Sequence, residues 1–265
     1  TPGSEAAGTV IEVGAEVVDI RVGDRVVYQG VMGAYAERAV VPADRAVRLP
    51  DNVSTRQAAA LMLQGLTAHY LSTSTYPLKS LDTCLVHAAA GGVGLLLCQL
   101  AKLRGARVIG TVSTQQKAEM AGGAGADHLI QYTTQDLVAE TRRLTDSHGV
   151  QVVYDSVGSV TFEQSLACLA PRGLMVLFGQ SSGPVPPFNP QVLNQGGSLY
   201  LTRPTLAHYV ATRTELLSRT GELFELLGSD RLAVRIDREL ALRDAAEAHR
   251  ALESRETMGK ILLIP

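Results

Sequence analysis

Cysteine, net charge and long apolar runs are all scarce in this 265-residue sequence. The three cysteines, Cys84, Cys98 and Cys168, are too few and too widely spaced for a disulfide framework or a cysteine-rich zinc lobe, so a reducing, cytoplasmic location is expected. The formal net charge of -2 gives no general electrostatic reason to bind nucleic acid or an anionic membrane. No apolar run approaches the ~20 residues of a membrane-spanning helix.

Glycine and proline punctuate the first 50 residues into short β-like runs, which predict a small, mostly antiparallel β unit. The expected strands there are residues 9–13, 25–28, 34–41 and 46–49. From about residue 66, aliphatic runs alternate with helical stretches, and several runs are almost wholly apolar, as in parallel strands covered on both faces. These runs are residues 83–87, 107–112, 128–130, 151–155, 174–179 and 198–202. Strand, helix and strand in this order predict a doubly wound α/β sheet of the Rossmann type.

The last 60 residues return to a different pattern. A helical stripe of apolar residues spans 209–227, a shorter one spans 245–252, and residues 261–264 form a closing strand. We therefore expect a β-rich domain made from both chain ends, residues 1–65 and 205–265. The α/β domain, residues 66–204, is expected to be inserted between them.

The most informative motif is Ala89-Ala90-Gly91-Gly92-Val93-Gly94, which follows a predicted strand and opens a predicted helix. It fills the GxGxxG frame with alanine at the first position. Gly91 permits close approach of the backbone to a pyrophosphate, and Gly94 permits close packing of helix on strand. The alternative is a tight turn that binds nothing, but the surrounding strand, helix and strand favour a dinucleotide site.

The end of the second strand indicates which dinucleotide. An NAD site usually places an acidic residue about 20 residues past the turn, where it holds the ribose hydroxyls. The sequence here is Ile109-Gly110-Thr111-Val112-Ser113-Thr114, with no acid, and Lys117 follows. A hydroxyl and a cation suit a 2′-phosphate, so NADPH is the expected cofactor. Lys117 as an ordinary solvated helix lysine is the alternative.

Candidate catalytic residues are not identifiable from spacing. His87 ends an apolar strand, where a core histidine is the more common case. Asp155 closes another strand and is expected to cap the following helix, with contact to the cofactor as the alternative. No Ser/His/acid constellation can be assembled, and hydride transfer needs none, since the nicotinamide supplies the chemistry and the protein supplies orientation.

Several motifs occur together in an order that resembles one protein family. They are residues 1–8 (TPGSEAAG), 22–26 (VGDRV), 64–68 (QGLTA), 88–94 (AAAGGVG), 125–127 (GAD), 154–158 (YDSVG), 178–183 (FGQSSG), 202–204 (TRP) and 259–260 (GK). The chain resembles, over essentially its whole length, the zinc-independent medium-chain reductases of the ζ-crystallin-like, NADPH:quinone oxidoreductase branch. That resemblance implies a Rossmann domain inserted into a GroES-like substrate domain. It also implies NADPH-dependent reduction of a quinone or related small electrophile, and a homodimer that meets near residues 198–202.

The resemblance also implies a set of cofactor-binding residues. Gly92 and Val93 match pyrophosphate positions, beside Gly91 and Gly94 of the same turn. The group around the adenosine 2′-phosphate matches Ser113, Lys117, Tyr132 and Arg255. The rest of the NADPH site matches Tyr70, Ser156, Phe178, Gly179 and Arg203. On residue type alone, these aromatics would be core or surface residues and the arginines solvated charges.

Two departures from the wider superfamily affect the expected chemistry. Zinc-dependent alcohol dehydrogenases have a histidine ligand where this chain has Ser4, a poor zinc ligand, so no catalytic zinc is expected and Glu5 is expected to be structural. Family members also carry several tens of residues before the segment that matches Thr1, so the N-terminal part of the substrate domain is expected to be missing. Reduction of enones, alkenals or enoyl thioesters, or NADPH binding without turnover, remain alternatives.

Overall fold

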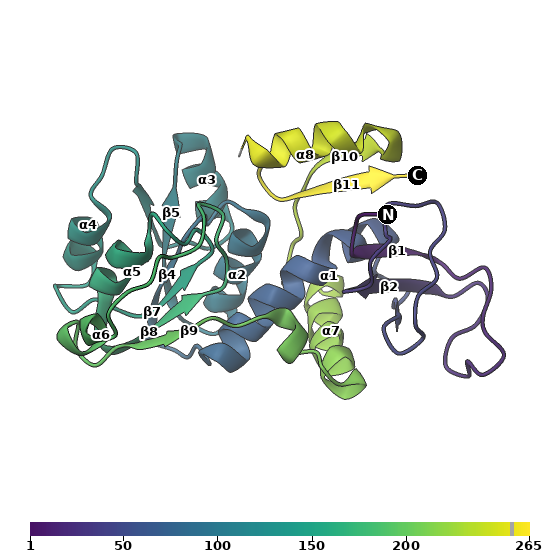
Figure 1. Cartoon of the computed structure of the whole chain (residues 1–265), viewed down its shortest axis with the longest axis horizontal. Coiled ribbons are helices and arrows are strands. Elements are labelled where there is room, and N and C mark those ends of the chain that lie inside the picture. The colour runs from purple at the N-terminus through teal and green to yellow at the C-terminus, as the bar shows by residue number, and fades with distance from the viewer. Residues whose placement is uncertain (255–256) are drawn as a thin grey trace. The chain divides into compact units, whose positions relative to one another are not determined.

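The computed structural model describes residues 1–254 and 257–265 and divides into two compact units (Figure 1). One comprises Thr1–Thr67 and Leu206–Pro265, and the other comprises Ala68–Thr205. The second unit is a parallel α/β unit whose segment interrupts a unit made from both chain ends, so the predicted fold class is confirmed. Arg255 lies outside the described residues. No described helix is long and apolar enough to cross a membrane.

The α/β unit is built on a six-stranded parallel sheet of order β6-β5-β4-β7-β8-β9. Its strands are β4 (Thr83–Val86), β5 (Arg107–Val112), β6 (His128–Gln131), β7 (Val150–Asp155), β8 (Leu169–Leu177) and β9 (Tyr200–Thr202). The chain lays β4, β5 and β6 outward on one side, then returns to place β7 on the other side of β4. This reversal is the switch point at which doubly wound folds bind their ligands.

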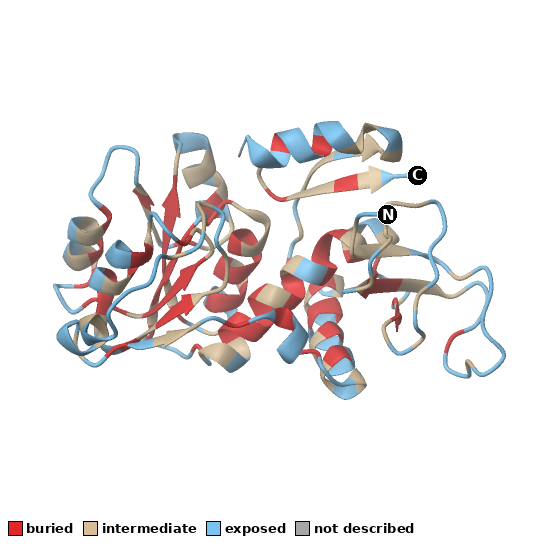
Figure 2. Cartoon of the chain, viewed as in Figure 1, coloured by how far each residue is buried: buried red, intermediate tan, exposed pale blue. Residues whose placement is uncertain are grey.

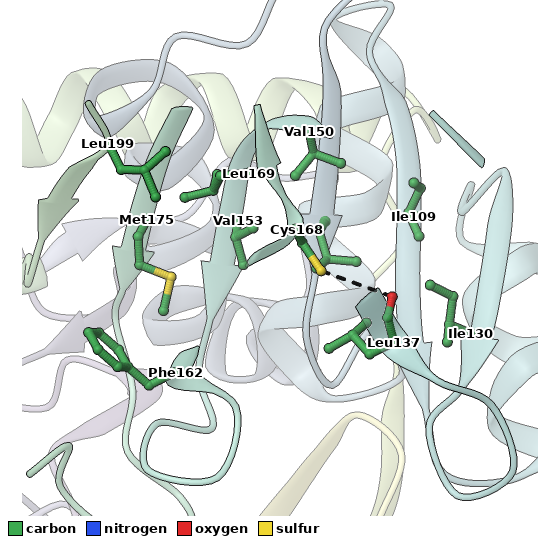
Figure 3. Packing of buried hydrophobic residues seen from close by; sticks show 11 residues of the cluster. Ile109, Ile130, Leu137, Val150, Val153, Phe162, Cys168, Leu169, Met175 and Leu199 are labelled. Atoms are coloured by element: carbon green, nitrogen blue, oxygen red, sulfur yellow. Dashed lines mark hydrogen bonds between the residues drawn. The ribbon is translucent and has the colours of Figure 1, made fainter. Parts of the chain in front are cut away.

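Helices connect these strands and cover the sheet. They are α2 (Gly92–Leu103), α3 (Gln115–Gly123), α4 (Leu137–Leu144), α5 (Phe162–Cys168) and α6 (Gln191–Gln195), preceded by a π-helical turn at Leu71–Thr75. The strands are largely buried (Figure 2), which explains why their sequences are apolar rather than alternating. Side chains from several strands meet α4 and α5 in one cluster that includes Ile109, Leu137, Val153, Phe162 and Met175 (Figure 3).

The other unit contains a three-stranded antiparallel sheet of β1 (Glu5–Thr9), β2 (Arg25–Gln29) and β3 (Val47–Arg48). Its C-terminal part contributes α7 (Arg213–Gly228), β10 (Ile236–Ala241), α8 (Ala245–Glu253) and β11 (Lys260–Ile264), and β10 pairs with β11 in parallel. Helix α1 (Thr55–Tyr70) and short 3-10 turns at Leu206–His208 and Leu242–Asp244 complete the described elements.

Two strand predictions in this unit are wrong. The strand expected at residues 9–13 lies earlier, at Glu5–Thr9, and no strand forms at residues 34–41. In the latter segment the amides of Gly33 and Ala34 donate to the Gly3 carbonyl, and the Tyr35 amide donates to the Pro2 carbonyl. These local contacts hold the start of the segment in bends instead of a continuous ladder.

Candidate dinucleotide site

The predicted cofactor residues follow the carboxyl ends of the parallel strands. The glycine turn follows β4, Ser113 follows β5 and Tyr132 follows β6. On the other side of the switch point, Ser156 follows β7, Phe178 and Gly179 follow β8, and Arg203 follows β9. Because the strands are parallel, these ends share one edge of the sheet, which is where ligands bind in open α/β folds.

The turn between β4 and α2 has the geometry that a phosphate requires. Ala88 adopts a left-handed φ of 50°, and the Gly91 amide donates to the Ala88 carbonyl at 2.8 Å. Gly91 is the N-cap of α2 and provides no side-chain cap, so the first amide groups of the helix are open to an anion. A Cβ on Gly94 would lie 2.4 Å from the Ala88 carbonyl oxygen. The residues present therefore fit a dinucleotide pyrophosphate.

The second strand leads into a polar region. Ser113 and Lys117 are both half-buried, and Thr114 caps α3 by accepting from the Lys117 amide. The side chains of Gln131 and Thr133 donate to the Ser113 carbonyl at 3.4 and 3.2 Å, which fixes the end of β5 against β6. Tyr132 is 51% exposed. A hollow of about 400 Å³ lies between α3 and β6, and Gln115, Gln131 and Gln135 are among the residues that line it.

On the far side of the switch point, the ends of β7 and β8 are in close contact. The carbonyl of Asp155 accepts from the amides of Phe178 and Gly179 at 2.9 and 3.2 Å. A Cβ on Gly179 would lie 2.4 Å from the Ser156 carbonyl oxygen, so only glycine fits there without a backbone shift. Arg203 is exposed and donates to the Pro204 carbonyl. Tyr70, at the end of α1, is 2% exposed and offers a ligand little surface.

Beneath the glycine turn lies a buried hydrogen-bond network that sequence reasoning did not identify. His87 Nδ1 is 3.1 Å from Thr111 Oγ1, and His87 Nε2 is 2.9 Å from Ser165 Oγ. Ser165 donates in turn to Asp155 Oδ2 at 2.9 Å. None of these four residues is more than 3% exposed. The available signal was a polar residue at or near the end of each of three apolar strands, β4, β5 and β7, but spacing does not reveal that these strands are neighbours in the sheet.

The network is not a nucleophilic triad. In such triads the histidine lies between the acid and the serine, whereas here Ser165 lies between His87 and Asp155. Burial lowers the pKa of His87, against the opposing effect of the Asp155 charge, so the imidazole is neutral at physiological pH. Asp155 does not cap the helix as expected. Its carboxylate instead accepts from the amides of Val157 and Gly158 before the helix begins, and Thr161 is the N-cap of α5.

Glu5, which follows the Ser4 position where no zinc ligand is expected, makes structural contacts. Among the described residues, no group of three or more His, Cys, Asp and Glu side chains is arranged to hold a metal ion. Glu5 pairs with Lys260 of β11 through Oε1, and its Oε2 accepts from the Leu63 amide at 3.0 Å. Both side chains are largely buried, at 14% and 16% exposure. This pair joins β1, α1 and β11 within one unit.

Replacing Lys260 by methionine is expected to lower the free energy of unfolding by about 2 kcal/mol, because Glu5 is left as a largely buried, unpaired carboxylate. Chemical denaturation measures the change. Arg243→Met is the matched control, since Arg243 and Asp244 form an exposed pair whose loss should change stability by less than about 0.5 kcal/mol. Equal effects of the two substitutions would show that the Glu5–Lys260 pair contributes nothing particular.

Comparison with known proteins matches both units. Residues 1–51 match the alcohol dehydrogenase GroES-like domain, and residues 92–217 match the zinc-binding dehydrogenase family. A quinone oxidoreductase of Salmonella typhimurium is 52% identical over 266 residues, spanning 99% of this chain and 81% of that protein. A 2-haloacrylate reductase of a Burkholderia species is 41% identical, over 99% of this chain and 80% of that protein.

A solved structure gives the same result in three dimensions. The crystal structure of Escherichia coli quinone oxidoreductase complexed with NADPH superposes with a TM-score of 0.97 at 51% identity, covering 100% of this chain and 82% of that one. Members of one family share sequence identity at this level over nearly the whole chain, whereas proteins that share only a fold do not. The chain belongs to the quinone oxidoreductase family of medium-chain dehydrogenases and reductases.

Proposed function

We propose that this chain is an NADPH-dependent oxidoreductase that reduces quinones without zinc. The observation that carries the proposal is the likeness, over the whole chain, to an E. coli quinone oxidoreductase crystallised with NADPH. The β4–α2 turn supports it independently, because its open helix N-terminus and its lack of room for a Cβ suit a pyrophosphate. NADPH, when bound, supplies the hydride for reduction of the carbonyl acceptor.

The residues assigned to the cofactor, all of them in the α/β unit except Arg255, divide into groups by the part of the dinucleotide that they bind. The glycine turn, Gly91–Gly94, holds the pyrophosphate through backbone amides. Ser113, Lys117 and Tyr132 surround the 2′-phosphate, and Arg255 belongs with them by family resemblance. Ser156, Phe178, Gly179, Arg203 and Tyr70 are assigned to the remainder of the cofactor site. Burial of Tyr70 is the one observation that weighs against its membership.

Three further proposals complete the assignment. The unit made from Thr1–Thr67 and Leu206–Pro265 is the substrate domain, in keeping with its GroES-like match. The protein acts in the cytoplasm, where three unpaired cysteines are stable in reduced form. It forms a homodimer through β9, the edge strand of the parallel sheet, where Tyr200 is 61% exposed.

A second candidate reaction is reduction of an activated C=C bond. It is favoured by the likeness to a 2-haloacrylate reductase, whose name denotes an acceptor with a carbon–carbon double bond beside a carboxyl group. A substrate panel of a menadione-type quinone, an alkenal and a crotonyl thioester separates the two. Turnover of the quinone well above the others supports the first candidate, and the reverse order supports the second.

Lys117→Ala tests the cofactor assignment. Fluorescence titration should show that the parent chain prefers NADPH over NADH. The variant should bind NADPH about 10- to 100-fold more weakly, because a charged hydrogen bond to a phosphate contributes about 1.5–3 kcal/mol. NADH binding should be unchanged, since NADH has no 2′-phosphate.

Lys79→Ala is the matched control, because Lys79 is an exposed lysine of the same unit that is not assigned to the site. It should leave both affinities unchanged. Equal binding of NADPH and NADH by the parent chain would contradict the assignments of Ser113 and Lys117. Absence of binding by either nucleotide would contradict the dinucleotide site itself.

A further inference from the structure

The buried network forms a single chain of hydrogen bonds across the middle of the sheet. It runs from the Ala88 amide to Thr111 Oγ1 at 3.3 Å, then to His87, Ser165 and Asp155. Its members come from the β4–α2 turn, which begins at His87, and from β5, α5 and β7. It therefore crosses the switch point, from the β5 side to the β7 side.

The direction of each hydrogen bond follows from the Asp155 carboxylate, which only accepts. The Ser165 hydroxyl donates its one proton to Asp155, so its oxygen must accept from His87 Nε2–H. The neutral imidazole then has Nδ1 as an acceptor, and Thr111 donates its hydroxyl proton to it. Thr111 Oγ1 is left to accept the Ala88 amide. Every donor and acceptor along the chain is satisfied in this one arrangement.

Each end of this chain holds a turn of the proposed cofactor site. At one end, Thr111 binds the Ala88 amide through its hydroxyl and the Ala89 amide through its carbonyl, which fixes the left-handed Ala88 before the glycine turn. At the other end, the Asp155 carboxylate binds the amides that follow Ser156, while its carbonyl binds those of Phe178 and Gly179. The two ends are thus linked through His87.

We propose that His87 is a positioning residue that holds the glycine turn and the turns after β7 and β8 at a fixed spacing, so that both halves of the dinucleotide bind together. This rests on the proposed NADPH site. The imidazole is suited to the role because a neutral ring donates at one nitrogen and accepts at the other across a rigid plane. His87 does not contact the cofactor itself, since it lies beneath the turn and is buried.

Thr111→Val and Ser165→Ala test the proposal by removing one hydroxyl on either side of His87. Two probes are titrated: NADPH, which spans both halves of the site, and 2′,5′-ADP, which lacks the nicotinamide half. Each variant should weaken NADPH binding about 10-fold, the equivalent of one buried hydrogen bond, and weaken 2′,5′-ADP less than about 2-fold. The double variant should bind NADPH no more weakly than either single variant, because removal of one hydroxyl already interrupts the hydrogen-bond network.

Controls separate positioning from general damage to the core. Thr141→Val makes the same substitution at an equally buried threonine of α4 that is not part of the hydrogen-bond network. It should leave both affinities unchanged. Thr111→Ser retains the hydroxyl and should restore NADPH affinity to within about 2-fold of the parent. Should Thr111→Val fail to fold, Ser165→Ala decides alone, because alanine is well tolerated in helix α5.

The outcomes are distinguishable. If both variants bound NADPH and 2′,5′-ADP more weakly by the same factor, the positioning role would be overturned while the proposed function stayed intact. The same holds if neither variant bound NADPH more weakly than the parent. Additive losses in the double variant would equally overturn it. Failure of the parent chain to bind NADPH or 2′,5′-ADP would instead overturn the proposed function on which the inference rests.

Discussion

Gly94→Ala is expected to weaken NADPH binding about 100-fold and to destabilise the protein by about 2–3 kcal/mol. The added Cβ would meet the Ala88 carbonyl oxygen at 2.4 Å and the Ala89 Cα at 2.8 Å, and both are backbone atoms that no rotamer change can move. The turn must shift away from α2 to make room, and forced overpacking of this kind typically costs about 1–3 kcal/mol. The shift also moves the amides that hold the pyrophosphate.

Gly221→Ala is the matched control for this substitution. Gly221 also lies within an α-helix, α7, but a Cβ there would meet nothing within 4 Å. Alanine should therefore stabilise the protein by about 0.5–1 kcal/mol through backbone entropy and leave NADPH affinity unchanged. Thermal unfolding and fluorescence titration measure both variants. A Gly94→Ala protein that binds NADPH as the parent does would show that the close approach of turn and helix is not needed.

Asp155→Ala is expected to lower the free energy of unfolding by about 4 kcal/mol. The fully buried carboxylate accepts from the amides of Val157 and Gly158 and from the hydroxyls of Thr161 and Ser165, at 2.7–3.0 Å. Alanine leaves four donors without this acceptor, and each buried unsatisfied group costs about 1–3 kcal/mol before relaxation. Partial re-pairing with other groups reduces the sum.

Asp136→Ala is the control, because it gives the loss of stability expected when an ordinary helix-capping aspartate is removed. Asp136 is exposed and caps α4 by accepting from the Ala139 amide, so its loss should cost about 1 kcal/mol. Urea denaturation of the three proteins gives both differences. If Asp155→Ala cost no more than Asp136→Ala, the buried carboxylate would not be the anchor of the β7 turn that its contacts indicate.

The α/β unit was largely predictable because its strands are buried on both faces. Burial on both faces favours apolar residues, so the predicted strand at residues 107–112 coincides with β5, and the helix predicted to open at the glycine turn is α2. The glycine turn was equally readable, since its spacing reflects a steric requirement of the backbone. In both cases a local pattern expresses a constraint that acts on adjacent residues.

The N-terminal unit was harder to predict because its structure depends on contacts between residues far apart in the sequence. Residues 34–41 have the composition of a strand, yet the segment starts in bends held by the carbonyls of Pro2 and Gly3, more than 30 residues earlier in the chain. The buried network escaped prediction for the same reason. His87, Thr111, Asp155 and Ser165 lie on four different elements, and only the strand order brings them together.

The burial of all three cysteines has a consequence for a protein of this family. Quinones are electrophiles that alkylate thiolates, and reactivity requires both ionisation and access. Burial raises the pKa of Cys98 to about 12 and that of Cys168 to about 11, and raises that of Cys84 further. The thiols stay protonated and shielded within the α/β unit. For the proposed quinone reductase, this burial protects the protein from covalent inactivation by its substrate.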